Sequence, residues 1–197
     1  MKYLLRLIII PMVYVISFAF LTMGLASIEG FPQIVKSIIS IILLVLFIIV
    51  MSLVMIKEGH DAYGVLLINN AQRRRIVETG VVVDFDQSTE YRPYKGFLVG
   101  LICCVPLILM VIAHLIIAPI GLTSRISIIC EMVYGLFFSI FRTYLNTDAT
   151  GFFIISGVIL VVFPLIMGIP YMLGARKRRL YQENVKKLND ELHGVKK

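Results

Sequence analysis

The stretch Ser124–Arg142, SRISIICEMVYGLFFSIFR, decides the topology of this 197-residue chain. It is apolar enough for a membrane, but only sixteen residues separate Arg125 from Arg142, and Glu131 lies among them. A transmembrane helix needs about 20 apolar residues. If this stretch crosses the bilayer, the number of crossings becomes odd and the two ends of the chain lie on opposite sides.

The composition is that of an integral membrane protein. Hydrophobic residues make up 59% of the chain and charged residues 16%, whereas soluble domains carry about 25% charged residues. So few charged side chains leave too little polar surface to cover a water-soluble globule. We therefore predict one compact bundle of helices in a membrane.

Four apolar runs are long enough to cross a hydrocarbon layer of about 30 Å at about 1.5 Å per residue. These predicted spans cover about residues 4–26, 34–56, 96–118 and 151–173. The first run follows Lys2 and includes Arg6, as in a secretory signal peptide. Its apolar part of about twenty residues exceeds the 7–15 typical of such a signal, so we predict an uncleaved anchor.

The distribution of basic residues orients these spans. Of the nineteen Lys and Arg residues, sixteen lie in the N-terminal end, in the loop 57–95 and after the fourth span. Basic residues near span ends are retained in the cytoplasm. Four spans place all sixteen there, with both termini cytoplasmic, whereas a fifth span would expose either the basic tail or the loop 57–95.

The stretch 125–142 is therefore predicted to enter and leave on the outer side. Its polar and small residues recur every three to four positions and form one stripe on a helix. They are Ser127, Glu131, Gly135, Ser139 and Arg142. We predict a helix that lies in the outer interface or is re-entrant. Glu131 is the candidate functional acid, since a carboxylate at membrane depth must be paired; on an interfacial helix it would face water.

The loop 57–95 is predicted to carry a helix from about Asp61 to Thr79, stopped at Gly80. Residues 81–86, VVVDFD, favour a short strand, and the segment 87–95, QSTEYRPYK, is rich in turn residues. The spans and this loop together form a membrane domain of residues 1–174.

The tail 175–197 is predicted to continue the fourth span as a basic amphipathic helix. Its apolar residues follow the 4-3-4 spacing of a coiled-coil seam, and they are Tyr181, Val185, Leu188 and Leu192. A seam this short does not hold a free coiled coil. We predict that it is buried against the helix 61–79, a second copy of the chain or a protein partner.

Two basic clusters follow the second and fourth spans. They consist of Arg73, Arg74 and Arg75, and of Arg176, Lys177, Arg178 and Arg179. Basic residues beside a membrane attract anionic lipid at about 1 kcal/mol per charge, and contact with an acidic partner is the alternative. Fixing the orientation would by itself explain both clusters. Their position at the membrane and the lack of a nucleic-acid recognition motif argue against nucleic acid as a binding partner.

The sequence offers no constellation for catalysis, a metal or a cofactor. It has no G-x-S-x-G, no H-E-x-x-H and no phosphate loop. Cys103, Cys104 and Cys130 lack the spacing of ligands or disulfides and are interpreted as packing residues. The acidic residues Asp84, Asp86 and Glu90 lack the length and glycine of a calcium loop and are interpreted as solvated. His114 is interpreted as a hydrogen-bonded or interfacial residue near the outer end of the third span.

The predicted fold is an all-α membrane protein. It is a four-helix transmembrane bundle with both termini inside, an outer-side amphipathic helix and cytoplasmic helical extensions. The pattern favours a non-catalytic subunit, assembly factor or scaffold of the cell membrane that docks a partner through its cytoplasmic helices. A transporter or pore component, with Glu131 or kinked spans along its path, is the alternative, and an enzyme acting on lipid is a third reading.

Overall fold

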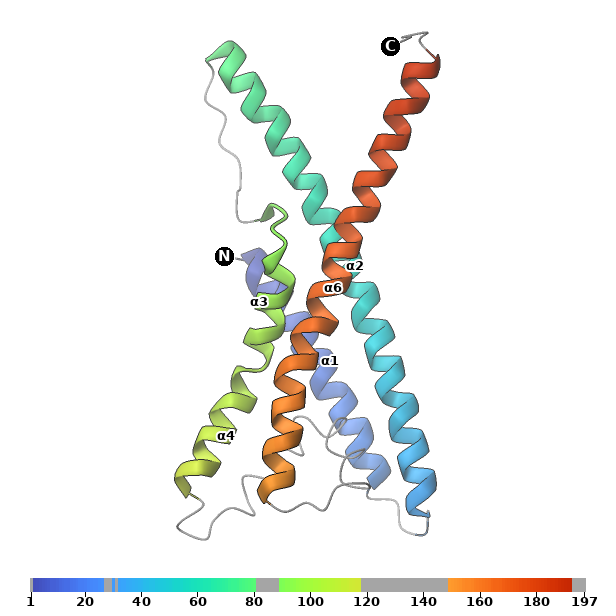
Figure 1. Cartoon of the computed structure of the whole chain (residues 1–197), viewed down its shortest axis with the longest axis vertical. Coiled ribbons are helices and arrows are strands. Elements are labelled where there is room, and N and C mark those ends of the chain that lie inside the picture. Colours follow the sequence, from blue (N-terminus) through green and yellow to red (C-terminus); the bar gives the residue numbers. More distant parts are fainter. Residues whose placement is uncertain (1, 27–29, 31, 81–88, 118–148, 193–197) are drawn as a thin grey trace.

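The protein is a bundle in which two long helices cross as an X (Figure 1). This computed structural model describes residues 2–26, 30, 32–80, 89–117 and 149–192. The helices are α1 (Lys2–Ala26), α2 (Gln33–Thr79), α3 (Tyr94–Cys103), α4 (Val105–Ile117) and α6 (Ala149–Leu192), and no strand occurs within these ranges. The predicted outer helix 125–142, which contains Glu131 and Cys130, and the predicted strand 81–86 lie outside the described residues.

Two of the helices, and a third bent pair, have the lengths and surfaces of membrane-crossing segments. Both α2 and α6 are long and apolar enough to cross a membrane, and α3 with α4 supplies a third such segment if the bent pair counts as one. Large apolar side chains, among them Ile42, Leu53 and Val161, are exposed on their outer sides. Water-soluble monomers rarely expose large contiguous apolar surface, so the described helices have the character of a membrane protein.

Helix α2 is one unbroken helix of 47 residues, about 70 Å long at about 1.5 Å per residue. The helix expected over about Asp61–Thr79 is present, but it does not start at Asp61, because it is continuous with the second apolar run. The expected stop is confirmed. Gly80 adopts the left-handed conformation at φ 69°, and its N–H donates to the carbonyl of Ile76 at 2.8 Å.

The third apolar run is not a straight helix. It bends by 42° between α3 and α4. Pro106 has no N–H to donate to the carbonyl of Ile102, and its ring is crowded against that carbonyl, so the helix cannot continue regularly. Cys104 lies at the bend, where its N–H reaches the carbonyls of Gly100 and Leu101 at 3.2 and 3.0 Å.

Helix α6 confirms the predicted continuation of the fourth apolar run into the tail. It runs for 44 residues with Pro164 and Pro170 inside it. The predicted boundary between residues 174 and 175 thus falls within one helix. About 27 Å of it, at about 1.5 Å per residue, lies beyond Gly174.

Successive helices alternate in direction, with the bent pair α3 and α4 counted as one (Figure 1). Helix α1 lies antiparallel to α2, and α3 with α4 lies antiparallel to α6, whereas α2 and α6 run in the same direction (Figure 1). Fully buried side chains of α2 and α6 fill the centre, with Phe47 between Phe18 and Phe163 at ring-centroid distances of 5.4 and 6.2 Å. Beyond the crossing the two helices diverge as arms. We name them the α2 arm (Asp61–Thr79) and the α6 arm (Ala175–Leu192).

Candidate functional site

The point at which α2 and α6 cross is built from glycine. A Cβ atom on Gly59 of α2 would overlap the carbonyl oxygen of Tyr171, and one on Gly174 of α6 would overlap the carbonyl oxygen of Ile56. The two backbones therefore touch directly, as small residues allow in membrane helices. We call this contact the crossing. It holds α2 and α6 together at the point beyond which both arms extend.

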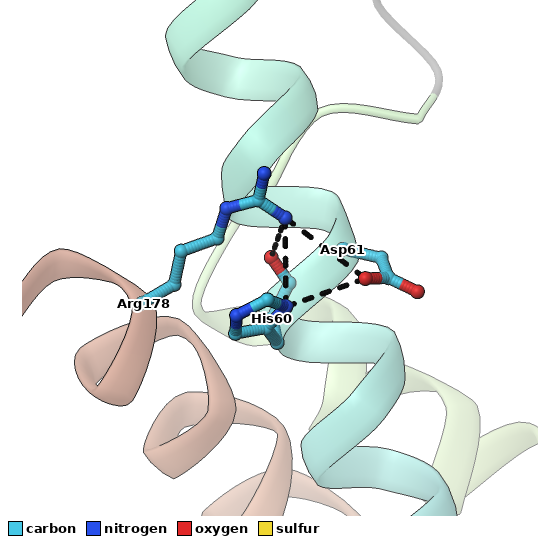
Figure 2. A network of polar contacts seen from close by, with 3 residues as sticks. All are labelled: His60, Asp61 and Arg178. Carbon is cyan, nitrogen blue, oxygen red and sulfur yellow. Dashed lines mark hydrogen bonds and ion pairs between the residues drawn. The ribbon is translucent and has the colours of Figure 1, made fainter. Parts of the chain in front are cut away.

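A polar network closes the crossing on the side of the arms (Figure 2). The Arg178 guanidinium lies across Gly64, and its Nη1 donates to the carbonyl oxygen of His60 at 3.2 Å. The same atom lies 3.9 Å from Asp61 Oδ1. His60 Nδ1 lies 3.3 Å from Asp61 Oδ1 and 3.4 Å from Arg178 Nη1. Because one ring nitrogen either donates or accepts, it serves one of these neighbours at a time.

A second polar cluster ties the α2 arm to the start of α3. Glu90 is only 5% exposed, and its Oε1 accepts hydrogen bonds from Asn69 Nδ2 at 2.8 Å and Arg73 Nη2 at 2.6 Å. Lys95 Nζ donates to the Glu90 carbonyl oxygen at 2.6 Å. We call these four residues the Glu90 clamp. The expectation that Glu90 is solvated was wrong, because two side chains from one face of α2 surround its carboxylate.

The clamp favours the ionised carboxylate. Burial raises the pKa of Glu90, but the hydrogen bonds from Asn69 and Arg73 and the charges of Arg73 and Arg92 lower it further, so that the pKa lies below its ordinary value. Charge-assisted hydrogen bonds of this kind are stronger than neutral ones. The clamp is therefore an electrostatic tie between two segments of the chain.

The next residue extends this tie to α6. The N–H of Tyr91 donates to the carbonyl oxygen of Ala62 at 3.1 Å. Its ring stacks on Tyr171 with centroids 5.4 Å apart and meets the edge of Tyr63 at 5.8 Å. The segment before α3 thus contacts both long helices next to the crossing, and it holds them in one arrangement.

Two residues of the predicted basic clusters make contacts within the chain, and the other five are exposed. Arg73 is held by Glu90 and Arg178 by the crossing, so each makes a contact within the chain. The other members are exposed: Arg74, Arg75, Arg176, Lys177 and Arg179. Arg179 pairs with Glu183 at 2.9 Å along its own helix. The structure thus leaves five of the seven residues facing outward.

The four apolar residues of the tail, which we call the tail seam, are exposed. Tyr181 and Leu192 are 68% and 72% exposed, and Val185 and Leu188 are also exposed. They continue a stripe of α6 that packs against α2, since steps of three and four residues lead from Gly174 through Arg178 to the seam. The stripe is uncovered beyond the crossing because α2 diverges there (Figure 1).

Two buried polar atoms lie at the other end of the bundle. His114 on α4 lies against Phe152 of α6 with ring centroids 4.8 Å apart and ring planes tilted by 31°, and its Nδ1 has no hydrogen-bond partner. Ser156, one turn along from Phe152, likewise has a buried Oγ with no partner. The hydrogen bond predicted for His114 is therefore not made through Nδ1.

One contact could have been found from the sequence. Gly96 and Gly100 have the G-x-x-x-G spacing that marks close helix contacts in membranes. In the structure a Cβ atom on Gly100 would overlap Pro164, and one on Gly96 would crowd Gly168 and Tyr171 of α6. This glycine pair lets α3 pack against α6 and so positions the Glu90 clamp.

Comparison with protein-family models, with curated proteins and with solved structures finds no significant match to this chain.

Proposed function

We propose that this chain is a non-catalytic membrane scaffold with four spans, which holds two cytoplasmic helical arms at a fixed angle and docks a partner on them. The glycine crossing and the Glu90 clamp support a rigid arrangement of the arms. The exposed tail seam is the observation that carries the proposal, because an apolar stripe on a polar helix is unfavourable in water unless it is covered.

The arrangement of the helices supports the four-span topology. Helices α2 and α6 run in parallel, so both arms lie at the same end of the bundle (Figure 1). The ends of α4 and α6 at the other end of the bundle are close, since His114 contacts Phe152 and Phe153. The chain between them would therefore begin and end on one side. With basic residues concentrated in the arms, that side is the exterior of a cell membrane.

The exposed basic residues fit two kinds of contact. Arg176, Lys177 and Arg179 lie within five residues of Gly174, about 8 Å along the helix, where anionic lipid headgroups attract basic residues. Arg74 and Arg75 lie at least fifteen residues beyond Gly59, about 22 Å along the helix, farther than a screening length of about 8 Å. We propose lipid contact for the α6 cluster and contact with an acidic protein surface for the α2 pair.

Transport is the second candidate function. The buried Nδ1 of His114 and Oγ of Ser156, which have no hydrogen-bond partner, favour it, because an ionisable side chain inside a membrane helix bundle is a candidate functional residue. The spans otherwise carry only scattered hydroxyl residues. Flux through proteoliposomes that is lost in Glu131→Gln would favour transport over the scaffold.

Photo-crosslinking from the tail seam tests the scaffold. A photoreactive residue in place of Leu188 is expected to give one discrete adduct in native membranes, because a docked partner covers that side of the α6 arm. The same residue in place of Lys187, on the other side of the helix, is the matched control and should give none. Equal or absent adducts from both positions would contradict the proposal. The mass of the adduct distinguishes a second copy from another protein.

A further inference from the structure

The residues beside the tail seam restrict what can cover it. In a coiled coil, the positions next to the seam face the partner helix. Between Tyr181 and Leu192 these positions are the uncharged Gln182, Asn184 and Asn189, together with Glu191. The lysines of this part of the arm, Lys186 and Lys187, lie on the opposite side. An acidic helix would therefore gain little at the seam, whereas a helix with uncharged flanks fits it.

A second copy of this chain meets that requirement. In a parallel pair of α6 arms in register, Asn184 of one copy faces Asn189 of the other, and Lys177 faces Gln182. Neither pair brings like charges together, and the asparagines can exchange hydrogen bonds. Each seam residue would meet the same residue of the other copy. Arg176 and Arg179 lie off the stripe, and Arg178, which lies on it, is turned toward the carbonyl oxygen of His60 in its own chain.

Insertion in one membrane would set the direction and register of such a pair. Two copies with the same orientation project their α6 arms from the same side, starting at the same residue, Gly174. An isolated helix of about 12–15 residues is marginal in water, but here the arm is the end of a 44-residue helix. Confinement in the membrane also raises the effective concentration of the second arm.

The α2 arm of the same chain is a poorer occupant. The side of α2 that faces α6 at Gly64 continues through Leu67 and Ala71 to Arg74, so its apolar part is short. The two arms also diverge from the crossing (Figure 1). The Glu90 clamp holds the α2 arm in that direction, because it connects Asn69 and Arg73 to the segment before α3.

We propose that the tail seam is covered by the tail seam of a second copy, so that two chains pair in parallel through their α6 arms. This inference rests on the proposed scaffold and names the partner at its seam. The paired arms would form the stem of a dimeric scaffold. The α2 arms, with Arg74 and Arg75, would remain free for another protein.

Disulfide trapping of the full-length protein in native membranes tests the pairing. Cys130→Ala removes one native thiol, and Cys103 and Cys104 are buried in the bundle. We expect Val185→Cys and Leu188→Cys to form covalent dimers more than about tenfold faster than Lys186→Cys and Lys187→Cys, because only seam positions reach the Cα separation of about 4.4–6.8 Å that a disulfide needs. Diluting the membranes with lipid should leave the dimer yield at the seam positions unchanged.

Each outcome separates this inference from the scaffold itself. Equal rates at all four positions would overturn the pairing. If the Leu188 photo-adduct then contained another protein, the scaffold would stand with a different partner. If neither experiment gave a product, both proposals would fall. As a second measurement, a Val185→Asp/Leu188→Asp variant is expected to sediment as a monomer in mild detergent where the unmodified chain sediments as a dimer, and an unchanged dimer would also overturn the pairing.

Discussion

Gly174→Ala is expected to lower the free energy of unfolding by about 3 kcal/mol, the upper end of what overpacking costs. The added methyl group would overlap the carbonyl oxygen of Ile56. That oxygen belongs to the backbone of a continuous helix and cannot rotate away, so α2 and α6 must separate. The separation would also disturb the nearby contact of Arg178 with His60.

Gly157→Ala on the same helix is the matched control. No atom lies within 4 Å of a Cβ at that position, and alanine is the better helix former by about 1 kcal/mol. This variant should be as stable as the unmodified chain or slightly more so. The free energies of unfolding of both variants are measured by denaturant titration in detergent, with thiol labelling of the buried Cys103 and Cys104 as the readout of unfolding. Equal destabilisation by the two variants would refute a backbone contact at the crossing.

Glu90→Ala is expected to free the α2 arm from the segment before α3, at a cost of about 2–3 kcal/mol. Asn69 would lose its buried acceptor and Arg73 its counter-charge, and an abandoned buried donor costs about 1–3 kcal/mol. Hydrogen exchange of the backbone amides of residues 62–79 and of Tyr91 should quicken. Glu78→Ala removes an exposed carboxylate from the end of the same arm and should leave exchange unchanged. Equal exchange in both variants would show that the clamp does not hold the arm.

The same clamp predicts a dependence on pH. The pKa of Glu90 in the folded protein lies below its ordinary value of 4.5, so its stabilising contribution is complete above that value and is lost as the pH falls through the lowered pKa. Protection of the α2-arm amides, that is, their exchange corrected for its intrinsic pH dependence, should therefore fall only under acid conditions and stay constant around neutral pH. Glu90→Gln should weaken the clamp at neutral pH and remove this acid response.

Much of the helical layout follows from apolar run length and helix stop signals. The run before Gly80 and the run that continues into the tail predicted where α2 ends and that α6 extends past the fourth apolar run. The start expected at Asp61 was wrong because Gly59 and Gly64 do not interrupt α2. Their effect on α2 itself is small, and what they provide is room for α6, which depends on a contact more than a hundred residues away in the chain.

The Glu90 clamp could not be predicted for the same kind of reason. Asn69 and Arg73 lie 21 and 17 residues from Glu90, and nothing in the local sequence distinguishes this carboxylate from a solvated one. The sequence also does not decide whether the tail seam is covered within the chain, since its spacing permits burial against the α2 arm, a second copy or another protein. Only the divergence of the arms removes the first of these.

The central claim is that both arms lie on the cytoplasmic side of a membrane, and thiol labelling in intact cells tests it most directly. Single cysteines at Glu78→Cys on the α2 arm and Lys187→Cys on the α6 arm, each on the Cys130→Ala background, are treated with a membrane-impermeant maleimide. The proposed topology predicts that neither cysteine is labelled until the cells are permeabilised, after which both are. Labelling of either cysteine in intact cells would contradict it.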